Sequence, residues 1–406
     1  LAQFGREGLS DDEMTRRASA LHARTQGNPF FIEQLLRSEL ADQQSAEVAA
    51  IRSTAPTSPP GDVRSFMTEK LQNLQPAQRA VVAALDIAGG HAEPNLLAAL
   101  ARLPAAALEI AAESLVTQGL IRPVEQGYGF AHDRVQEAAR RLTPLDERPA
   151  QHARAARLLL ASDAAERPGE RLRVAGLILK AVDGGAVDHL RSGARLRFAA
   201  NLRRAADLAT TSGSLEQAAA YIDAADALLK ASWWTDRPAL VVAIKQASVA
   251  SLMTRGRLAD AEAHLAALLA HDLPALSQAE TYRLLAVLRT VQSDYDAAIS
   301  AALAGLDLLG HRLERHPSEQ ACLEQAERIR TMMGDRPDAA FALRPLSDNP
   351  ATALSTSLLS TLIVATFSGD RLLFTHVAKI VELTLAEGIS SNSAYGLAWY
   401  GVMIAH

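Results

Sequence analysis

The feature that most restricts the fold is a six-residue pattern that occurs three times in the second half of the chain. It reads GSLEQA from Gly213, GRLADA from Gly256 and SDYDAA from Ser293. Each copy consists of a small or polar turn, then an apolar residue, and finally an alanine, at Ala218, Ala261 and Ala298. Apolar residues follow the first two alanines at the spacing of one helix face. Because alanine lets two helices approach closely, the pattern predicts pairs of packed helices.

Successive copies of this alanine lie 43 and 37 residues apart, and only helices are predicted from about Pro144 onward. Tetratricopeptide repeats use small residues in the same way, at a shorter period of roughly 34 residues. The longer spacing indicates longer helices or loops, so we interpret residues 144–406 as a tetratricopeptide-like α-solenoid. An alanine-rich helical bundle without regular stacking is the alternative. Either interpretation predicts a mostly α fold.

The first part of the chain contains a corner between two predicted helices. The sequence SDDE, which starts at Ser10, is a capping box and begins a helix that we expect to end near Thr25. Gly27, Asn28 and Pro29 then interrupt the apolar spacing. Proline is favoured in the first turn of a helix, where its missing N–H costs nothing, so Pro29 predicts the start of a second helix.

A linker separates this corner from a compact block. The sequence IRSTAPTSPPGDV at residues 51–63 contains three prolines and several Ser and Thr residues. Helices are predicted beyond it over residues 63–74, 76–88, 94–102 and 104–118. The sequence LIRPVEQGYGFAH then predicts two short strands around a turn at residues 125–127. Helices followed by a hairpin are typical of a winged helix, so we assign residues 62–143 to a winged-helix-like subdomain.

Composition and charge indicate a foldable, soluble protein. Hydrophobic residues make up 49% of the chain and charged residues 21%. The net charge of -5 gives no broad basic field, so non-specific binding to nucleic acid is not predicted. A single cysteine, Cys322, excludes an intrachain disulfide and a multi-cysteine metal site. No signal peptide is visible, and we expect a cytoplasmic protein.

One uncharged stretch, residues 351–369, has the composition of a buried helix rather than of a membrane span. It contains eight Ser or Thr residues and follows Pro350. We therefore expect no membrane span. The chain starts without a methionine and stops inside the apolar sequence YGLAWYGVMIAH, with no helix cap. These ends lead us to expect a piece of a longer protein.

Motifs for catalysis are missing from the sequence. The phosphate-binding loop G-x-x-x-x-G-K-[ST] does not occur, and none of the five lysines follows a glycine. The motifs G-x-S-x-G and H-E-x-x-H do not occur either. His311 and His316 are five residues apart, which is a poor helical pairing for a metal. We therefore predict no catalytic residue, no metal ligand and no ATP hydrolysis by this chain alone.

The helix expected to read DNA in a winged helix has the wrong charge. Residues 104–120 contain Glu109 and Glu113 and no lysine or arginine. Carboxylates at these positions would repel phosphate, and charge dominates affinity for DNA. The sequence predicts a subdomain that packs against protein and makes no direct contact with nucleic acid.

A second candidate contact with a ligand lies where the last strand meets a helix, in FAHDRVQEAARRL at residues 130–142. Asp133 can cap this helix, whose start has unpaired N–H groups and a positive dipole end. His132 can donate a hydrogen bond to a phosphate oxygen there. The alternative is a structural cap beside a partly buried histidine.

Taken together, TQGNPFFIEQLL and GYGFAHDRVQEAARRL closely resemble the ATPase module of large bacterial signalling proteins. Those proteins combine a serine/threonine-kinase-like domain, an AAA-type ATPase of the STAND class, tetratricopeptide-like helices and often a sensor histidine kinase. The resemblance includes LLGHRLERHPS, SDNPATALSTSLL and AEGISSNSAYGLAWYGV in the helical region, and so extends over nearly the whole chain. It implies that residues 1–55 are the helical lid at the end of the ATPase module.

The resemblance also implies a nucleotide site. In STAND ATPases a G-x-P corner in the lid packs its proline against adenine, and Gly27, Asn28 and Pro29 match that corner. A histidine–aspartate pair at the end of the winged helix reaches the β-phosphate of ADP, and His132 and Asp133 match that pair. The implied cofactor is ATP or ADP, shared with an ATPase core that lies outside this chain together with its phosphate loop and Mg²⁺-binding residues.

The function that the resemblance implies is regulatory. ADP would hold the lid and the winged helix together, exchange to ATP would release them, and a protein partner would bind the helical repeats. The parent protein would be an ATPase and a histidine or serine/threonine kinase. Two alternatives remain open: a protein-binding scaffold without nucleotide contact, and the regulatory region of an ATP-dependent transcriptional activator.

Overall fold

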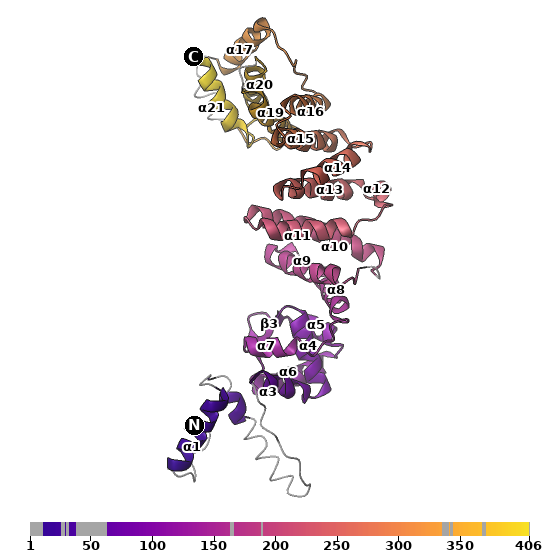
Figure 1. The fold of residues 1–406 in the computed structure, drawn as a ribbon, viewed down its shortest axis with the longest axis vertical. Helices are drawn as coiled ribbons and strands as arrows, with labels where there is room; N and C mark the ends of the chain where they lie inside the picture. Colours follow the sequence, from indigo (N-terminus) through magenta and orange to yellow (C-terminus); the bar gives the residue numbers. More distant parts are fainter. Residues whose placement is uncertain are drawn as a thin grey trace. The chain divides into compact units, whose positions relative to one another are not determined.

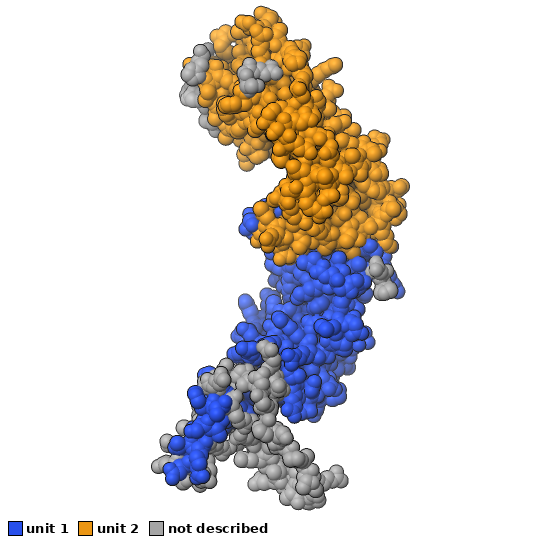
Figure 2. Space-filling model, viewed as in Figure 1, with its two compact units in different colours: residues 1–213 blue, residues 214–406 orange. Residues whose placement is uncertain are grey.

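The computed structural model describes residues 11–25, 29, 32–37, 63–162, 166–187, 190–334, 341, 344–367 and 371–405. The chain divides into two compact units, which Figure 2 shows in blue and orange, Leu1–Gly213 and Ser214–His406. Helices make up most of the described residues, as predicted, and the strands named among them are three short ones in the first unit (Figure 1). We describe each unit by itself.

Unit 1 begins with the two helical segments of the predicted corner. Helix α1 spans Asp11–Thr25 and ends at the predicted residue, while Ser10 of the capping box lies outside the described residues. Residues 32–37 are also helical. Leu21 of α1 forms a small core with Leu35 and Leu36. The corner is therefore a junction between two helices that bury apolar side chains together.

The compact block contains the predicted helices and hairpin, together with one strand that was not predicted. Its helices are α3 (Val63–Gln72), α4 (Pro76–Ile87), α5 (Pro94–Ala101), α6 (Ala105–Thr117) and α7 (Asp133–Ala139). Its strands are β1 (His91–Ala92), β2 (Ile121–Val124) and β3 (Gly127–Phe130), in the antiparallel order β1-β3-β2. Gly127 adopts φ +135°, and a Cβ there would lie 2.2 Å from the carbonyl oxygen of Ala92. This close approach lets the third strand join the hairpin.

Three longer helices complete unit 1, namely α8 (Arg148–Leu159), α9 (Pro168–Asp183) and α10 (Ser192–Thr211). Helix α9 packs against both α8 and α10. Small buried residues such as Ala155, Ala156 and Ala175 lie on these helices and allow the close packing. Helix α8 also contacts α4 and α5, so the array of long helices is joined to the compact block.

Unit 2 begins with the repeated helix pairs that the sequence pattern predicts. Its first helices are α11 (Leu215–Ala227), α12 (Trp233–Asp236), α13 (Pro238–Thr254), α14 (Leu258–Leu269), α15 (Ala275–Val291) and α16 (Tyr295–Leu308). From α13 to α16 each helix packs on the next, and α13 also contacts α11 and α15. The shared alanines Ala218, Ala261 and Ala298 are 7%, 0% and 2% exposed. Their burial confirms that they lie where helices meet.

Four helices follow the stack: α17 (Glu319–Met333), α19 (Pro350–Thr366), α20 (Arg371–Glu387) and α21 (Ser393–Ile404). The uncharged helix α19 buries Leu358, Leu359 and Leu362, as its composition predicts. No single helix among the described residues is long and apolar enough to cross a membrane. The pair α5 and α6, bent by 103°, meets the length and composition test only when the two are taken together.

Candidate functional site

His132 lies at the junction between β3 and α7 and caps the helix. Its backbone is extended, with φ -153° and ψ 148°, and its Nδ1 accepts a hydrogen bond of 3.2 Å from the backbone N–H of Arg134. Asp133 is the first residue of α7 and is exposed. The sequence-based assignment of the cap to Asp133 was therefore wrong. Both side chains can accept an N–H, but the residue with extended backbone precedes the helix, and that residue is His132.

The cap determines which ring nitrogen of His132 carries the proton in the neutral imidazole. Because Nδ1 accepts a hydrogen bond, the neutral imidazole has its proton on Nε2. The side chain is half-buried, so the ring has access to solvent. Asp133 places a negative charge in the first turn of α7, where it interacts favourably with the helix dipole. The junction thus places the Nε2–H of the neutral imidazole at the start of α7.

The other predicted site residues lie at the corner between α1 and the helical residues 32–37. Pro29 is helical and exposed, so its ring is accessible. Gly27 and Asn28 lie outside the described residues. The helical residues that follow Pro29 are held by polar contacts to the end of α6. Gln34 donates from Nε2 to the carbonyl oxygens of Gln118 and Gly119, at 3.2 and 3.4 Å.

Two cations support this contact. Arg37 donates to the carbonyl oxygen of Thr117, and the Nζ of Lys70 donates to Oε1 of Gln34 at 2.6 Å. The last carbonyls of a helix have no partner within the helix and lie at its negative dipole end, so an arginine is favourable there. Gln34 is 1% exposed, so its hydrogen bonds are partly buried, whereas that of Arg37 is exposed. Sequence reasoning missed these residues because a glutamine, an arginine and a lysine on helices form no motif.

A single turn connects the lid contact to the histidine junction. Gly119 follows α6 with φ +66°, and the N–H of Leu120 closes the turn on the carbonyl of Leu115 at 3.0 Å. The carbonyl of Leu120 in turn accepts a hydrogen bond of 3.1 Å from the N–H of Ala131. Gln34 therefore contacts Gly119, while the residue just before His132 contacts Leu120. The structure brings the helix after Pro29 and the His132 junction to neighbouring residues of one turn.

The lysine in this contact has an altered protonation equilibrium. Burial, followed by the positive charge of Arg37, lowers the pKa of Lys70 to about 8. Near neutral pH two cations therefore approach each other beneath the lid residues. The contact of residues 32–37 with the end of α6 thus combines the hydrogen bonds of Gln34 and Arg37 with a repulsion between Arg37 and protonated Lys70.

A buried polar joint connects the compact block to the long helices. Asp86 of α4 is 6% exposed and pairs with Arg148 of α8 at 3.0 Å and with Arg140 at 3.9 Å. Burial raises the pKa of the Asp86 carboxyl, and Arg148 and Arg140 oppose that rise. Arg173 of α9 donates to the carbonyl oxygens of Ala88 and His91, at 2.8 and 2.7 Å. These contacts join the block to helices α8 and α9.

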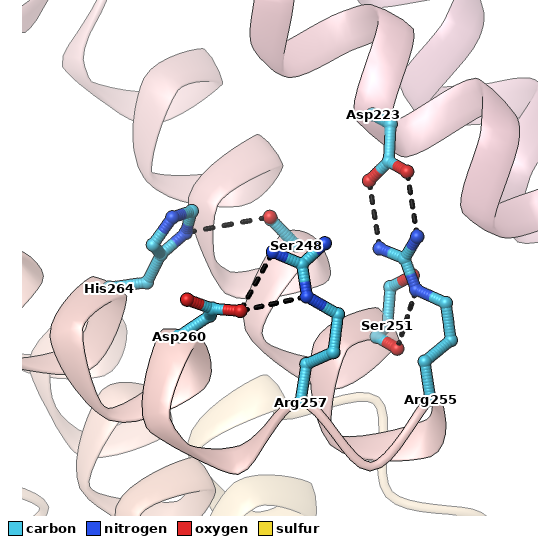
Figure 3. Close-up of polar contacts among 7 residues, drawn as sticks. All are labelled: Asp223, Ser248, Ser251, Arg255, Arg257, Asp260 and His264. Carbon is cyan, nitrogen blue, oxygen red and sulfur yellow. Dashed lines mark hydrogen bonds and ion pairs between the residues drawn. The ribbon is translucent and has the colours of Figure 1, made fainter.

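The turns of the repeats in unit 2 are also held by polar contacts, which Figure 3 shows for the α13–α14 turn. The carboxylate of Asp223 on α11 accepts hydrogen bonds from both terminal nitrogens of Arg255, at 2.7 and 2.9 Å. Arg257 bonds Asp260 on the far side of the turn at 2.7 Å. Gly213, Gly256 and Ser293 each lie five residues before a shared alanine and have φ 79°, 72° and 62°. The three copies of the pattern therefore share a left-handed turn residue as well as the alanine.

Among the residues that the structure describes, no group of three or more His, Cys, Asp or Glu side chains is arranged to hold a metal ion.

The chain was compared with protein families, curated proteins and solved structures. No protein-family model matches the chain, and no curated protein is similar in sequence. A solved structure that is similar is a STAND protein, a signal transduction ATPase with numerous domains, with a tetratricopeptide repeat sensor, from Pyrococcus horikoshii. The two share 14% sequence identity with a TM-score of 0.37, over 98% of this chain and 60% of that chain. The present chain thus corresponds to about three-fifths of the length of that protein.

Proposed function

We propose that the chain is the regulatory part of a nucleotide-dependent signalling ATPase of the STAND class, located in the cytoplasm. In this proposal residues 1–55 are the lid, residues 62–143 a winged-helix-like subdomain, and residues 144–406 the repeat region that binds a protein partner. The observation that supports it is the convergence of the lid helix and the His132 junction on the turn Gly119–Leu120. A nucleotide between them would contact both.

The residues would act on ADP in different ways. Pro29 would offer a rigid apolar surface to the adenine, with little entropy lost on stacking. His132 would donate from Nε2 to a phosphate oxygen, while Nδ1 keeps the helix capped. Loop residues and Mg²⁺ ligands outside this chain would hold the remaining phosphates. Loss of these contacts would free the lid from the end of α6.

The joint at Asp86 gives the proposed switch a route to the repeats. Because Arg148 and Arg173 attach α8 and α9 to α4 and the following loop, a displacement of the block would displace these two helices with it. The differential contacts of ADP and ATP would then select between two arrangements of the lid.

The test measures ADP affinity in a chain that includes the upstream ATPase core. We expect His132→Ala and Pro29→Ala each to weaken ADP binding by about tenfold, the effect of one lost charged hydrogen bond or stacking contact. His316→Ala and Pro144→Ala, which remove an exposed histidine and an exposed proline elsewhere, serve as matched controls. His132→Asn retains an acceptor for the cap and should still weaken ADP binding, which separates phosphate binding from helix capping.

A protein-binding scaffold is the second candidate, and the regular stack of α13 to α16 favours it. Stacked helix pairs provide an extended surface for a partner without any nucleotide. In that case His132→Ala would lower the stability of unit 1 through the lost cap and leave ADP affinity unchanged. Equal ADP affinity in His132→Ala, Pro29→Ala and their controls would rule out the switch and favour the scaffold.

A further inference from the structure

Unit 1 contains a groove lined by arginines that the proposed nucleotide contact does not use. Two cavities of about 580 and 420 Å³ share Arg157 and Leu190 in their walls. Five arginines line them, and we call the two cavities together the arginine groove: Arg102, Arg154, Arg157, Arg191 and Arg197. No Asp or Glu occurs among the described residues of the lining.

These arginines come from separate parts of the unit. Arg102 follows α5, Arg154 and Arg157 lie one turn apart on α8, and α10 contributes Arg191 at its N-cap and Arg197 two turns later. Arg102 has φ +57°, a left-handed conformation that favours glycine. Arg102 is the left-handed C-cap that ends α5, so an arginine there has a small backbone cost that glycine would not have.

Among the described residues, the arginines of the groove have no acidic partner. Arg154 donates to the carbonyl oxygens of Ala99 and Leu100, which fixes its guanidinium in the wall. The other four arginines form no ion pair with any residue in the described ranges. Arginines elsewhere in unit 1 do find carboxylates, as Arg134 does with Glu137 and Arg173 with Glu170. Like charges gathered without counter-charge repel each other, and a bound anion would relieve this repulsion.

The excess of positive charge is also visible along the sequence. Residues 140–204 contain 14 Lys and Arg against 7 Asp and Glu, in a chain whose net charge is -5. The net charge of the whole chain therefore does not reveal that residues 140–204 are basic. Burial, followed by the charges of Arg102 and Arg157, lowers the pKa of Arg154, which is the electrostatic consequence of this crowding.

The chemistry of the lining selects the class of ligand. One guanidinium group can donate two parallel hydrogen bonds to the oxygens of a phosphate, a geometry that an ammonium group does not offer. The first turn of α10 has no acidic residue and no side-chain cap, and its Gly193 lines the groove with open space where a Cβ would be. Open cavities of this volume suit a small molecule. Among the described residues that line the two cavities there is no aromatic ring, so these residues offer no platform for stacking nucleic-acid bases.

We propose that the arginine groove binds a small anion with two or more phosphate groups. The groove lies between α5, α8 and the start of α10, away from the Gly119–Leu120 turn in the sequence, and it is a second site on unit 1. A ligand there would join α8 to α10 through charges that neither helix satisfies alone.

The test titrates inorganic tripolyphosphate into the chain as it exists and follows the heat of binding. We expect one site per chain, with inorganic phosphate weaker by about tenfold or more because it engages fewer arginines. Arg157→Ala and Arg191→Ala should each lower tripolyphosphate affinity by about tenfold. Arg122→Ala, an exposed arginine on β2 outside the groove, removes the same charge and should leave affinity within about twofold.

Two further variants sharpen the test. Arg102→Gly should weaken tripolyphosphate binding while the chain stays folded with equal or higher thermal stability, because glycine relieves the strain. His132→Ala should leave tripolyphosphate affinity unchanged, so this result and the ADP result can fail independently. The proposal is overturned if tripolyphosphate does not bind, if Arg122→Ala weakens it as much as Arg157→Ala, or if oligothymidylate binds more tightly than tripolyphosphate.

Discussion

The two units join their packed helices by opposite means. In unit 1 the joint between α4 and α8 depends on a carboxylate whose side chain is 3% exposed, Asp86, paired with Arg148. In unit 2 the α13–α14 turn depends on a buried alanine, Ala261, and its ion pair between Asp223 and Arg255 is open to solvent, with side chains 50% and 32% exposed. Both joints contain an Arg–Asp pair, but water screens only the second.

This difference shows how each joint specifies its geometry. A buried ion pair is tolerated only in the arrangement that satisfies both charges, so the unit 1 joint should be rigid and costly to break. An alanine contact with an exposed ion pair allows small adjustments, which a stack of repeats needs in order to be extended copy by copy. The predictions below compare the two joints, from the largest expected effect to the smallest.

Removing the buried carboxylate should cause the largest loss. Asp86→Ala leaves Arg148 without its partner at a site 19% exposed, and we expect unit 1 to lose about 3 kcal/mol of stability. The matched change Asp223→Ala should cost unit 2 less than about 1 kcal/mol. All three tryptophans, Trp233, Trp234 and Trp399, lie in unit 2. In Asp86→Ala, the unfolding midpoint measured as loss of helix by circular dichroism should therefore shift more than the midpoint measured by tryptophan fluorescence. Equal costs for the two aspartates would contradict the comparison.

Enlarging the alanine should have the next largest effect. Ala261 is 0% exposed, and Ala261→Leu would force α13 and α14 apart, at an expected cost of about 2 kcal/mol. Ala266→Leu, an exposed position on the same helix, is the control and should change stability by less than about 0.5 kcal/mol. Urea denaturation followed by tryptophan fluorescence measures both. If Ala261→Leu were neutral, the shared alanines would not be the points of close helix approach.

Much of this fold could be predicted from sequence because its signals are local. Proline at the first turn of α4, α5 and α9 and the spacing of apolar residues indicate where helices begin. The left-handed turn and alanine of each repeat are both present in the six-residue pattern. Strand β1 was missed because two residues are too few to show alternation, and its pairing with β3 is a tertiary contact.

The candidate site was only partly predictable. His132 was found because it stands at a strand–helix boundary, but sequence alone could not decide whether it or Asp133 caps α7, since the choice depends on one backbone angle. The contact of Gln34 with Gly119 joins residues far apart in the chain and leaves no local signal. The arginine groove was missed for another reason: the net charge of the whole chain averages out its basic segment.

Acid should weaken both units through buried histidines with different surroundings. Burial, with the positive charges of Lys180 and Arg148, lowers the pKa of His152 to about 4, and burial lowers that of His376 to about 4 as well. An unfolded histidine titrates near 6.5, so between pH 4 and 6.5 the unfolded state binds more protons. Stability is therefore complete above pH 6.5 and declines as the pH falls towards 4.

The same experiment separates the two units. Urea titrations at pH 7 and pH 5 should show a smaller loss in His152→Gln and in His376→Gln than in the unchanged chain. The raised pKa of Asp86 acts in the opposite direction, since its folded carboxyl binds protons more readily, and so reduces the effect in unit 1. Added salt should weaken the acid effect at His152, where two cations contribute, and leave it unchanged at His376. Tryptophan fluorescence reports unit 2, which contains His376. If the loss of stability at pH 5 measured by this fluorescence depended on salt, the assignment would be contradicted.

The smallest effect should come from the turn residues of the repeats, and it should have opposite signs at two positions. Ser293 and Gly256 occupy equivalent turns with φ 62° and 72°, and a Cβ at Gly256 would meet nothing within 4 Å. Gly256→Ser should therefore destabilise unit 2 only through backbone strain, by about 1 kcal/mol, and Ser293→Gly should stabilise it by up to about that amount. Tryptophan fluorescence in urea measures both variants. If Ser293→Gly instead destabilised the unit, the entropy of glycine in the unfolded chain would outweigh the backbone strain of serine. In that case the serine copy of the pattern is as well suited to the turn as the glycine copies.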